Sequence, residues 1–540
     1  MLGPSAHVDT FARDNLPAPE TWPDFLLSGF EYPEHLNAAV ELTDRMVEKG
    51  FGDNIALIGN GRLRTYKELA DWTNRLARAL VENLGLVPGN RVLIRSANNP
   101  AMVACWLAAT KAGAVVINTA PVQRAADLGR IADKAEIQFA LCDTRLLHDL
   151  VAASKTSRFL KTVIGFDGTA NFDAELDRLA LSKPVRFDPV QTGRDDVALI
   201  AFSCGATGAP KAAMHFHRDL LTVADGYARE ILALRSDDVV IGTPSLAFTY
   251  GLGGLAVFPL RYGAASILLE DPTPAELIGA MKEHKATICV SAPPVYRAVL
   301  KGKPSRADFA SLRLAISAGE ALPASTYETW RAQTGVEILD GIGSTEMLHI
   351  FISNRPGESA PGSSGRPVGA YEARIVDRHM REKERGRVGR LAVRGPTGCR
   401  YLSDLRQADN VRDGWNLTDD AFRQDSDGTF HFVARTGDLI MSDGQEIAAP
   451  EVEAAMLAHP SVAECAAVGI PDKERGEVVK AFIVPAYGEA GNAAWVKRLQ
   501  EQVKAAVGPE ASPRSVRFVD SLPRTATGKI QRFLLRQRSP

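Results

Sequence analysis

Short apolar runs alternate with segments of helical periodicity over the first 200 residues. The apolar runs predict strands at "RVLIRS" (91–96), "AVVINT" (114–119), "FALCD" (139–143), "KTVIGF" (161–166) and "VALIAFS" (197–203). Thr65 followed by Glu68 has the spacing of a capping box and predicts a helix start there. "NPAMVACWLAATKAG" predicts a second helix that ends at Gly113. This alternation predicts an α/β fold with mostly parallel, buried sheets.

The later part of the chain divides by its pattern. Strand-like runs continue at 264–270, 286–292, 312–320 and 336–346. "NRPGESAPGSSGRPVG" (354–369) then predicts a linker or surface loop, and the strands after it predict a small β-rich part. Beyond a polar break near residue 435, an α+β pattern follows. We therefore expect a large N-terminal domain over 1–436, built of parallel-sheet α/β layers plus the β-rich part, and a small mobile α+β C-terminal domain over 437–540.

Composition narrows the function classes. A chain of 540 residues is too long for one core, and 45% hydrophobic with 24% charged residues is typical of soluble globular proteins. The formal net charge of −2 gives no basis for binding nucleic acid or a membrane surface. No apolar stretch is long enough to span a bilayer, and the first thirty residues do not resemble a signal peptide. The six cysteines lack C-x-x-C spacing, which favours a reducing cytoplasm. The oligomeric state cannot be read from the sequence.

A glycine-rich loop, "FSCGATGAPKAA" (202–213), follows one predicted buried strand. It combines residues that suit a phosphate group, namely Gly205, Gly208, Ser203, Thr207 and Lys211. The glycines let the backbone approach an anion closely, the hydroxyls donate hydrogen bonds, and the lysine adds a point charge. The spacing is not that of a Walker A loop. Taken alone, the segment is equally consistent with an ordinary Gly/Pro turn.

Five further segments decide between these alternatives. They follow in the order "SAGEALP" (317–323), "DGIGSTEM" (340–347), "GWNLTDD" (414–420), "ARTGDLIMSDGQEIAAPEVE" (434–453) and "PRTATGKI" (523–530). With the loop, they resemble the adenylate-forming superfamily of AMP-dependent acyl- and aryl-CoA synthetases over nearly the whole chain. The resemblance implies an acid–thiol ligase that uses ATP, Mg²⁺ and CoA. Such an enzyme converts a carboxylate to an acyl-adenylate with release of pyrophosphate and then transfers the acyl group to CoA.

The resemblance also implies roles for individual residues. Lys529 matches the catalytic lysine that touches the substrate carboxylate and the phosphate, although an exposed surface lysine is its alternative interpretation. Glu346 and Thr207 match the groups near the metal, and Asp420 with Arg435 those near the ribose. The residues expected to bind the nucleotide are Ser203, Gly205, Gly208, Lys211, Ala318, Gly319, Glu320, Asp340, Gly341, Ile342, Gly343, Ser344, Thr345, Asp420 and Arg435.

The acid substrate is indicated by "LDGIGSTEMLHIFISNRPG" (339–357), which resembles aryl-CoA ligases of the benzoate and 2-aminobenzoate type. The implied pocket residues are Phe248, Tyr250, Gly251, Ala292, His349 and Ile350. Large inward residues make a short pocket that suits a small aromatic carboxylic acid. Met441 stands where benzoate ligases carry a lysine, and "RDNLPAPETWPDFL" (13–26) resembles 2-aminobenzoate ligases. We therefore expect 2-aminobenzoate, with benzoate as the alternative.

Some positions depart from the family pattern. Asp419 stands where the ribose motif carries glycine, Gly437 where the hinge carries an acid or a lysine, and Ile342 where an aromatic residue stacks on adenine. Two other functions therefore stay open. One is an aryl-adenylating enzyme that loads a carrier protein, and the other is a nucleotide-binding protein without turnover.

Overall fold

The computed structural model describes residues 2–169, 171, 173–203, 210–443, 445–486, 491–523 and 530–537. The chain forms two compact units. The first contains Met1–Glu372 and Arg394–Asn416, and the second contains Ala373–Val393 and Leu417–Pro540. The expected boundary between residues 436 and 437 concerns a hinge between moving parts, which compactness does not test, so it stays a prediction.

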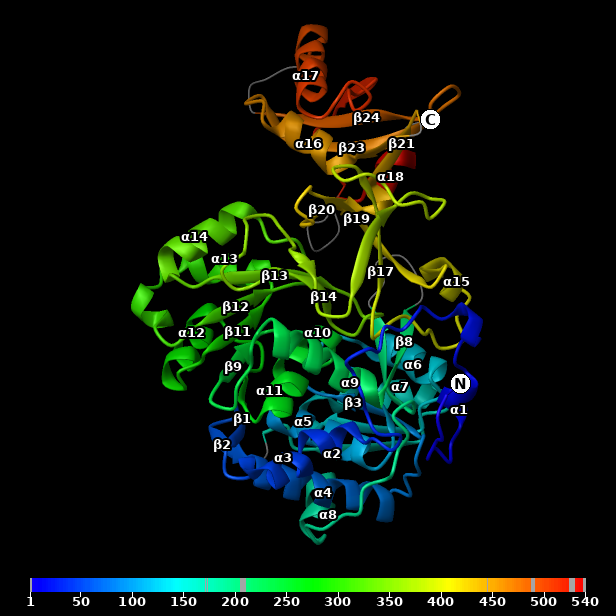
Figure 1. The fold of residues 1–540 in the computed structure, drawn as a ribbon, viewed down its shortest axis with the longest axis vertical. Coiled ribbons are helices and arrows are strands. Elements are labelled where there is room, and N and C mark those ends of the chain that lie inside the picture. The colour runs from blue at the N-terminus through cyan, green and yellow to red at the C-terminus, as the bar shows by residue number, and fades with distance from the viewer. Residues whose placement is uncertain are drawn as a thin grey trace. The chain divides into compact units, whose positions relative to one another are not determined.

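The first unit contains a six-stranded sheet in the order β6-β5-β3-β4-β7-β8 (Figure 1). Its strands are β3 (Arg91–Arg95), β4 (Val115–Thr119), β5 (Phe139–Asp143), β6 (Thr162–Phe166), β7 (Val197–Ser203) and β8 (Lys211–Phe216). All neighbours are parallel except β7 and β8. The apolar runs thus form the buried parallel strands that the sequence predicts.

Helices flank this sheet. The capping box predicted at Thr65 and Glu68 is present and begins α4 (Tyr66–Glu82). Asn99 caps α5 (Pro100–Lys111), which is buried along its whole length, and Gly113 follows with a φ of 78°. The other helices here are α6 (Ala125–Lys134), α7 (Leu147–Thr156) and α8 (Glu175–Leu181). Shorter elements are α1 (Phe11–Asp14), η1 (Pro19–Thr21), α2 (Ala38–Leu42), α3 (Asp44–Met46), η2 (Val47–Phe51) and η3 (Thr144–Leu146).

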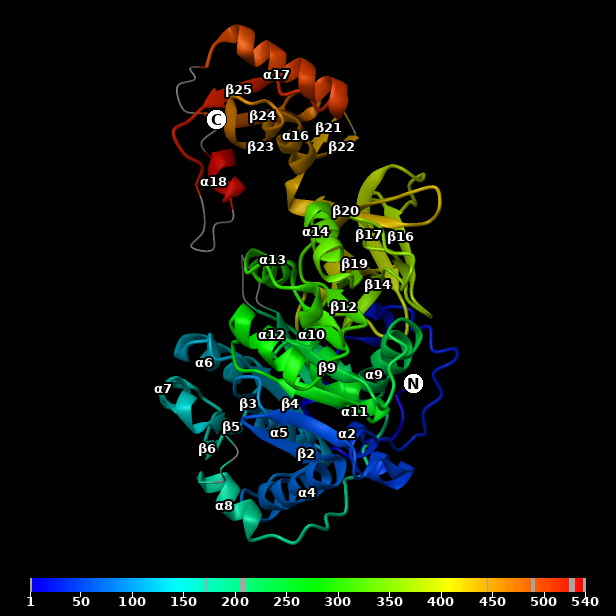
Figure 2. The same cartoon turned by 90° about the vertical axis from the view of Figure 1, so that its left-hand side faces the viewer.

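A nine-stranded sheet forms the rest of the first unit, in the order β15-β14-β13-β12-β11-β9-β10-β1-β2 (Figure 2). Its strands are β1 (Ile55–Gly59), β2 (Arg62–Thr65), β9 (Val239–Gly242), β10 (Ala265–Leu268), β11 (Ile288–Ser291), β12 (Leu314–Ser317), β13 (Ile338–Gly343), β14 (Ile350–Ser353) and β15 (Arg366–Pro367). The six strands from β13 to β1 run parallel, and antiparallel strands extend both edges.

The helices of this part are α9 (His217–Val223), η4 (Ala224–Ala228), α10 (Thr249–Leu252), η5 (Gly253–Val257), α11 (Phe258–Tyr262), α12 (Pro274–Glu283), α13 (Pro293–Lys301), η6 (Arg306–Phe309), α14 (Ala324–Thr334) and α15 (Gln407–Asn410). Both η4 and η5 are π-helical turns. Such turns are rare and are frequent at functional sites.

The segment 354–369 is in large part the surface loop that its composition predicts, since residues 356–362 are mostly exposed. Its first residue departs from this, because Asn354 is buried and its amide donates to the carbonyls of Asp340 and Ser363 at 3.0 and 2.7 Å. The glycine-rich stretch "FTYGLGG" forms α10 and the start of η5. His215 lies in β8, and His217 begins α9.

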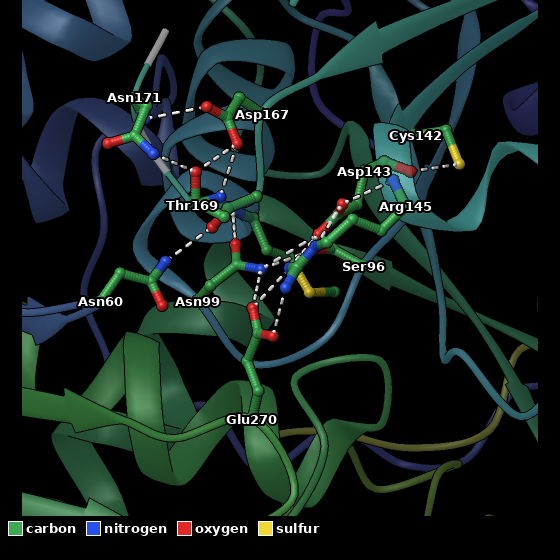
Figure 3. A network of polar contacts seen from close by, with 12 residues as sticks. Asn60, Ser96, Asn99, Cys142, Asp143, Arg145, Asp167, Thr169, Asn171 and Glu270 are labelled. Carbon is green, nitrogen blue, oxygen red and sulfur yellow. Dashed lines mark hydrogen bonds and ion pairs between the residues drawn. The ribbon is translucent and has the colours of Figure 1, made fainter. Parts of the chain in front are cut away.

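A buried polar cluster joins strand ends of the two sheets (Figure 3). Asp143 ends β5 with a fully buried carboxylate, and Arg145 pairs with it at 2.5 Å. Arg145 also pairs at 2.7 Å with Glu270, which follows β10. Asn99, the cap of α5, donates to Glu270 at 2.7 Å. The cluster therefore holds the two sheets together through charge.

The second unit is rich in strands. One sheet contains β16 (Glu372–Val376), β17 (Val388–Arg394), β19 (Trp415–Gln424) and β20 (Phe430–Arg435), and β18 (Val411–Arg412) pairs with the start of β19. The other contains β21 (Leu439–Ser442), β22 (Gln445–Ala448), β23 (Val462–Asp472), β24 (Gly476–Pro485) and β25 (Ser515–Phe518). Its helical elements are η7 (Thr436–Asp438), α16 (Ala449–Leu457), α17 (Ala493–Ala506) and α18 (Arg532–Gln537). This is the α+β pattern expected for the C-terminal residues.

Among the described residues, no helix has both the length and the apolar character needed to cross a membrane. The five cysteines in this part of the chain are buried and unpaired.

Candidate active site

The predicted phosphate loop lies between two antiparallel strands. Ser203 is the last residue of β7, and it stands opposite Lys211, the first residue of β8. The strands therefore bring a hydroxyl and an ammonium group to the two ends of the loop. Gly205, Thr207 and Gly208 lie outside the described residues.

A second turn carries the predicted metal-binding carboxylate. The chain runs through β13 and turns at Ser344 and Thr345 before β14, with Gly343 opposite Ile350. Glu346 follows in this turn and is half-buried. Its Oε1 accepts a hydrogen bond from the Tyr401 hydroxyl at 2.5 Å. Within the described part of the chain, Oε2 has no hydrogen-bond or ion-pair partner, so one carboxylate oxygen is fixed and one is available.

Lys211 belongs to the same cluster. Its Nζ lies 5.5 Å from the ring centroid of Tyr401, which is within the range of a cation–π contact. It also donates to Asn410 Oδ1 at 3.4 Å, and that oxygen is 3.4 Å from the Tyr401 hydroxyl. Burial, followed by the charge of Glu346, raises the pKa of Tyr401 far above its usual value, so the hydroxyl stays a neutral donor. The structure thus brings two predicted site residues, Lys211 and Glu346, to one tyrosine.

His215 holds the turn from the other side. Its Nε2 lies 2.9 Å from the carbonyl oxygen of Thr345. Burial lowers the pKa of His215 to about 4, so the ring is neutral near pH 7. His215 therefore has a structural role at this turn.

The expected adenine-site residues follow the ends of two neighbouring strands. Ala318, Gly319 and Glu320 come directly after β12, and Ser317 of β12 stands opposite Asp340 of β13. Gly319 has a φ of 93°, a conformation that favours glycine. The fold therefore places these two motifs side by side.

Asp340 is a buried acid whose carboxyl group makes few hydrogen bonds. Its Oδ2 accepts from the Leu322 amide at 3.4 Å, and no described residue is a partner of Oδ1. Burial raises the pKa of Asp340 to about 7. The Ser317 hydroxyl is also buried, and it makes no hydrogen bond of good geometry to a described residue. Unsatisfied buried groups of this kind are costly, and they are common where a ligand completes the hydrogen bonds.

His349 is enclosed by aromatic rings. The ring centroids of Phe258, Tyr227 and Tyr250 lie 4.5, 5.6 and 5.6 Å from that of His349. Burial lowers the pKa of His349 to about 3, so the imidazole is neutral. Neither ring nitrogen makes a hydrogen bond of good geometry to a described residue, and the backbone of Tyr250 makes the one contact that acts to raise the pKa. A neutral imidazole has one donor and one acceptor nitrogen, and a backbone carbonyl can serve only the donor.

The other expected substrate residues surround this histidine. Ile350 is buried in β14, directly after His349. The Tyr250 hydroxyl donates to the carbonyl of Ser291 at 2.9 Å, beside Ala292, which caps α13. Phe248 caps α10, which contains Tyr250 and Gly251. A Cβ on Gly251 would lie 2.1 Å from the carbonyl oxygen of Ser245, so only glycine fits there.

The predicted ribose residues pair with each other in the second unit. Asp420 and Arg435 stand opposite each other on β19 and β20, and their side chains form an ion pair of 2.9 Å. The Arg435 side chain is 62% exposed and that of Asp420 only 13%. Asp419, the departure from the family pattern, turns outward and pairs with Arg390 at 3.5 Å. The hinge candidate Gly437 lies in η7, and nothing is within 4 Å of where its Cβ would be.

Sequence reasoning missed four residues of these clusters. Tyr401, Asn410, Tyr227 and Phe258 lie outside the motifs, and the fold brings them to Glu346 and His349 from distant segments. No local pattern marks them. The predicted catalytic Lys529 lies outside the described residues.

Comparisons with known proteins identify the family. The model of the AMP-binding enzyme family matches residues 45–401, and that of the AMP-binding enzyme C-terminal domain matches residues 451–529. The chain belongs to the AMP-binding enzyme family. It is 36% identical to a benzoate–CoA ligase of Thauera aromatica, over 93% of this chain and 96% of that protein.

Two solved structures of the family are similar along their whole length. The anthranilate CoA ligase AuaEII in complex with anthranoyl-AMP has a TM-score of 0.78 and 30% identity, covering 94% of this chain and 98% of that one. A benzoate CoA ligase from Burkholderia xenovorans LB400 has a TM-score of 0.75 and 31% identity, covering 93% and 99%. These findings confirm the predicted superfamily, the α/β fold and an enzyme of the AMP-forming acid–thiol ligase type.

Proposed function

We propose that this chain is an ATP-dependent aryl-CoA ligase whose substrate is 2-aminobenzoate. The observation that carries the first half-reaction is the cluster in which Glu346 and Lys211 meet at Tyr401. An acid beside a lysine, next to a glycine-rich loop, suits a bound nucleotide triphosphate. The relatives of known activity support the aromatic acid, since their names are those of benzoate and anthranilate CoA ligases.

The first half-reaction forms the acyl-adenylate. A carboxylate oxygen of the acid attacks the α-phosphorus of ATP, the bond from that phosphorus to the bridging oxygen breaks, and pyrophosphate leaves with the electron pair. Phosphoryl transfer of this kind depends on positioning and on neutralising charge. We assign Lys211, Ser203 and the loop residues Gly205, Thr207 and Gly208 to the triphosphate, and Lys529 to the reacting carboxylate and phosphate.

Glu346 fits a magnesium ion that arrives with the nucleotide. Among the described residues no group of three or more His, Cys, Asp or Glu side chains could hold a metal. Mg²⁺ commonly binds through one or two carboxylates plus substrate phosphates, which matches one available oxygen of Glu346. By the family resemblance we also assign Thr207 to the metal. When bound, Mg²⁺ neutralises charge on the phosphate oxygens. Asp420 and Arg435 are assigned to the ribose hydroxyls, and Asp340 with its neighbours to adenine.

The second half-reaction uses CoA. The CoA sulfur attacks the acyl carbon, the bond to the AMP oxygen breaks, and AMP leaves while the thiol proton is lost to solvent. The product is the aryl-CoA thioester. CoA and the aromatic acid are therefore the partners that this chemistry requires, and the buried, unpaired cysteines agree with the proposed cytoplasmic location.

The particular acid is argued from His349. Its neutral ring has an acceptor nitrogen with no partner among the described residues, and it lies among aromatic side chains that would pack on a benzene ring. An amino group next to the substrate carboxylate can donate to that nitrogen, whereas benzoate cannot. A buried polar group left unpaired costs about 1–3 kcal/mol, which corresponds to about tenfold or more in kcat/KM. Benzoate is the alternative acid.

The test is turnover of a panel of acids. Purified protein is incubated with ATP, Mg²⁺, CoA and either 2-aminobenzoate, benzoate, 2-fluorobenzoate or octanoate, and products are identified by mass. We expect 2-aminobenzoyl-CoA to form with a kcat/KM about tenfold above that of benzoate. The variant His349→Ala should narrow this gap, and His379→Ala, an exposed histidine, should leave it unchanged.

Each other result has a separate meaning. Robust turnover of octanoate with inert aryl acids would reject the substrate class. Equal or better turnover of benzoate would reject the ortho-amino assignment. Adenylates that reach a phosphopantetheine carrier protein but not CoA would indicate a carrier-loading enzyme. Binding of ATP without product from any acid would indicate a nucleotide-binding protein.

A further inference from the structure

We propose that Tyr401 is a positioning residue of the adenylation site, which fixes Glu346 and Lys211 in the geometry that ATP with its metal ion requires. The proposal rests on the function proposed above, in which Glu346 meets the metal and Lys211 the phosphates. Tyr401 lies outside every motif that assigns a role to this chain. It touches neither the acid nor CoA in the assignment above.

The backbone around Tyr401 is fixed on several sides. The Met214 amide donates to the Arg400 carbonyl at 2.7 Å, and the Leu402 amide donates to the Ala212 carbonyl at 2.9 Å. Residues 400–402 therefore pair alongside β8, the strand that begins at Lys211, through an antiparallel bridge between Tyr401 and Ala213. The Tyr401 amide also donates to Oε1 of the buried Gln407 at 2.9 Å. Tyr401 is thus a rigid, fully buried side chain next to the phosphate lysine.

The hydroxyl of Tyr401 makes its short contact with Glu346. The oxygen–oxygen distance of 2.5 Å is that of a strong hydrogen bond from a hydroxyl to a charged carboxylate. Glu346 lies in a turn between β13 and β14, and a glutamate has three rotatable bonds, so the free side chain would sample several rotamers. One fixed oxygen leaves the other in a defined place. The hydrogen bond therefore supplies the preorganisation that a metal ligand needs.

The ring of Tyr401 acts on Lys211. The ammonium group is 5.5 Å from the ring centroid, and Asn410 Oδ1 lies 3.4 Å from both the ammonium nitrogen and the Tyr401 oxygen. Asn410 is itself buried and held by its donation to the Arg406 carbonyl at 2.9 Å. Tyr401 thus contacts both charged side chains, and Asn410 contacts both Tyr401 and Lys211.

The variant Tyr401→Phe separates the two contributions, because it keeps the ring against Lys211 and removes only the donor to Glu346. The readout is the affinity of the ATP-bound protein for Mn²⁺, measured by electron paramagnetic resonance titration with Mn²⁺ in place of Mg²⁺. A hydrogen bond to a charged group commonly changes an equilibrium constant by about tenfold or more. We expect Tyr401→Phe to weaken Mn²⁺ binding by about that factor and to raise the KM for Mg²⁺·ATP, with the KM for the acid little changed.

A matched control is Tyr66→Phe. Tyr66 is also fully buried, and its hydroxyl donates to the carbonyls of Ala264 and Pro259 at 2.8 and 3.0 Å, away from the candidate site. It should lower the melting temperature without changing Mn²⁺ affinity. The variants Glu346→Gln and Tyr401→Phe/Glu346→Gln complete a double-mutant cycle. If Tyr401 acts through Glu346, the double variant should bind Mn²⁺ no more weakly than Glu346→Gln.

The outcomes separate this proposal from the proposed function. If Glu346→Gln binds Mn²⁺ more weakly but Tyr401→Phe binds it with wild-type affinity, only the role of Tyr401 is overturned. Additive losses in the double variant would also overturn it, because Tyr401 would then act independently of Glu346. If Glu346→Gln binds Mn²⁺ with wild-type affinity, the metal assignment of the proposed function is rejected, and the role of Tyr401 with it.

Discussion

At the scale of single residues, Asp340 shows a conflict between stability and binding. Its carboxyl is 5% exposed, and one oxygen has no partner among the described residues. Burial raises its pKa to about 7 from 3.8. The folded state therefore holds the proton between these two values, and the unfolded state does not. Stability falls as the pH rises from about 4 to about 7, and above pH 7 the full cost of the buried charge is present.

We therefore expect Asp340→Asn to stabilise the protein at neutral and alkaline pH. One pKa unit corresponds to about 1.4 kcal/mol, so the buried charge costs on the order of 4 kcal/mol above pH 7. The gain in melting temperature should grow between pH 4 and pH 7 and then level off, measured by differential scanning fluorimetry. Asp188→Asn, at a carboxyl whose side chain is 87% exposed, is the control. If the difference in melting temperature between Asp340→Asn and the wild type stays constant across this pH range, Asp340 does not have the raised pKa of a buried acid.

The residues that the sequence identified share one property. Asp340, Glu346 and His349 sit in one contiguous segment whose order and spacing match a family, so a resemblance can assign them. Tyr401 contacts Glu346 across 55 positions, and Tyr227 reaches His349 from a π-helical turn. Such contacts depend on how strands are ordered in the sheets. No pattern along the chain contains that information.

At the scale of elements, strands and helices were easier to predict than the segments between them. Runs such as 197–203 are continuous, apolar and bounded by polar residues, so they predicted buried strands correctly. The glycines of "FTYGLGG" are typical of a turn, yet this segment is helical. A Cβ on Gly253 would lie 2.4 Å from Cδ2 of His349, so this glycine provides close packing and not a bend. Tertiary packing decided the local structure there.

The cluster of Asp143, Arg145 and Glu270 gives an element-scale prediction (Figure 3). Arg145→Ala would leave the fully buried Asp143 carboxylate with the backbone amide of residue 145 at 3.1 Å and with Ser96 and Asn99 at 3.4 and 3.5 Å. Because the Arg145 side chain is 45% exposed, solvent screens its ion pairs, and the cost should stay below the roughly 3–5 kcal/mol of breaking a fully buried pair. We expect a measurable loss of stability in chemical denaturation. Arg124→Ala, whose side chain is 77% exposed and pairs with Asp149 at 3.5 Å, should change little. If Arg145→Ala and Arg124→Ala lower the free energy of unfolding equally, the cluster does not hold the two sheets together.

At the scale of the whole molecule, the question is how one protein performs two half-reactions. The family resemblance implies that the C-terminal domain rotates about a hinge, and Gly437 is the candidate position. In the second unit Arg536 donates to the Gly437 carbonyl at 2.5 Å, and Arg532 pairs with Asp438 at 3.3 Å and with Glu453 at 2.8 Å. Both arginines belong to α18, which follows Lys529 closely in the sequence. The hinge candidate and the helix that follows Lys529 in the sequence are thus physically connected.

This connection leads to a prediction about Lys529. If Lys529 serves only adenylation, Lys529→Ala should lower the rate of acyl-adenylate formation by on the order of 10²–10³, the usual effect of removing a preorganised charged donor. Thioester formation from supplied aryl-adenylate and CoA should stay within a few-fold of the wild type. Single-turnover kinetics of each half-reaction measure this, with the exposed Lys504→Ala as control. Because Arg532 anchors α18 through Asp438 and Glu453, and the substitution leaves these ion pairs in place, the variant should stay folded. Equal loss of both half-reactions in a folded variant would reject the assignment of Lys529 to one orientation, and with it the hinge at Gly437 as the means of separating the two steps.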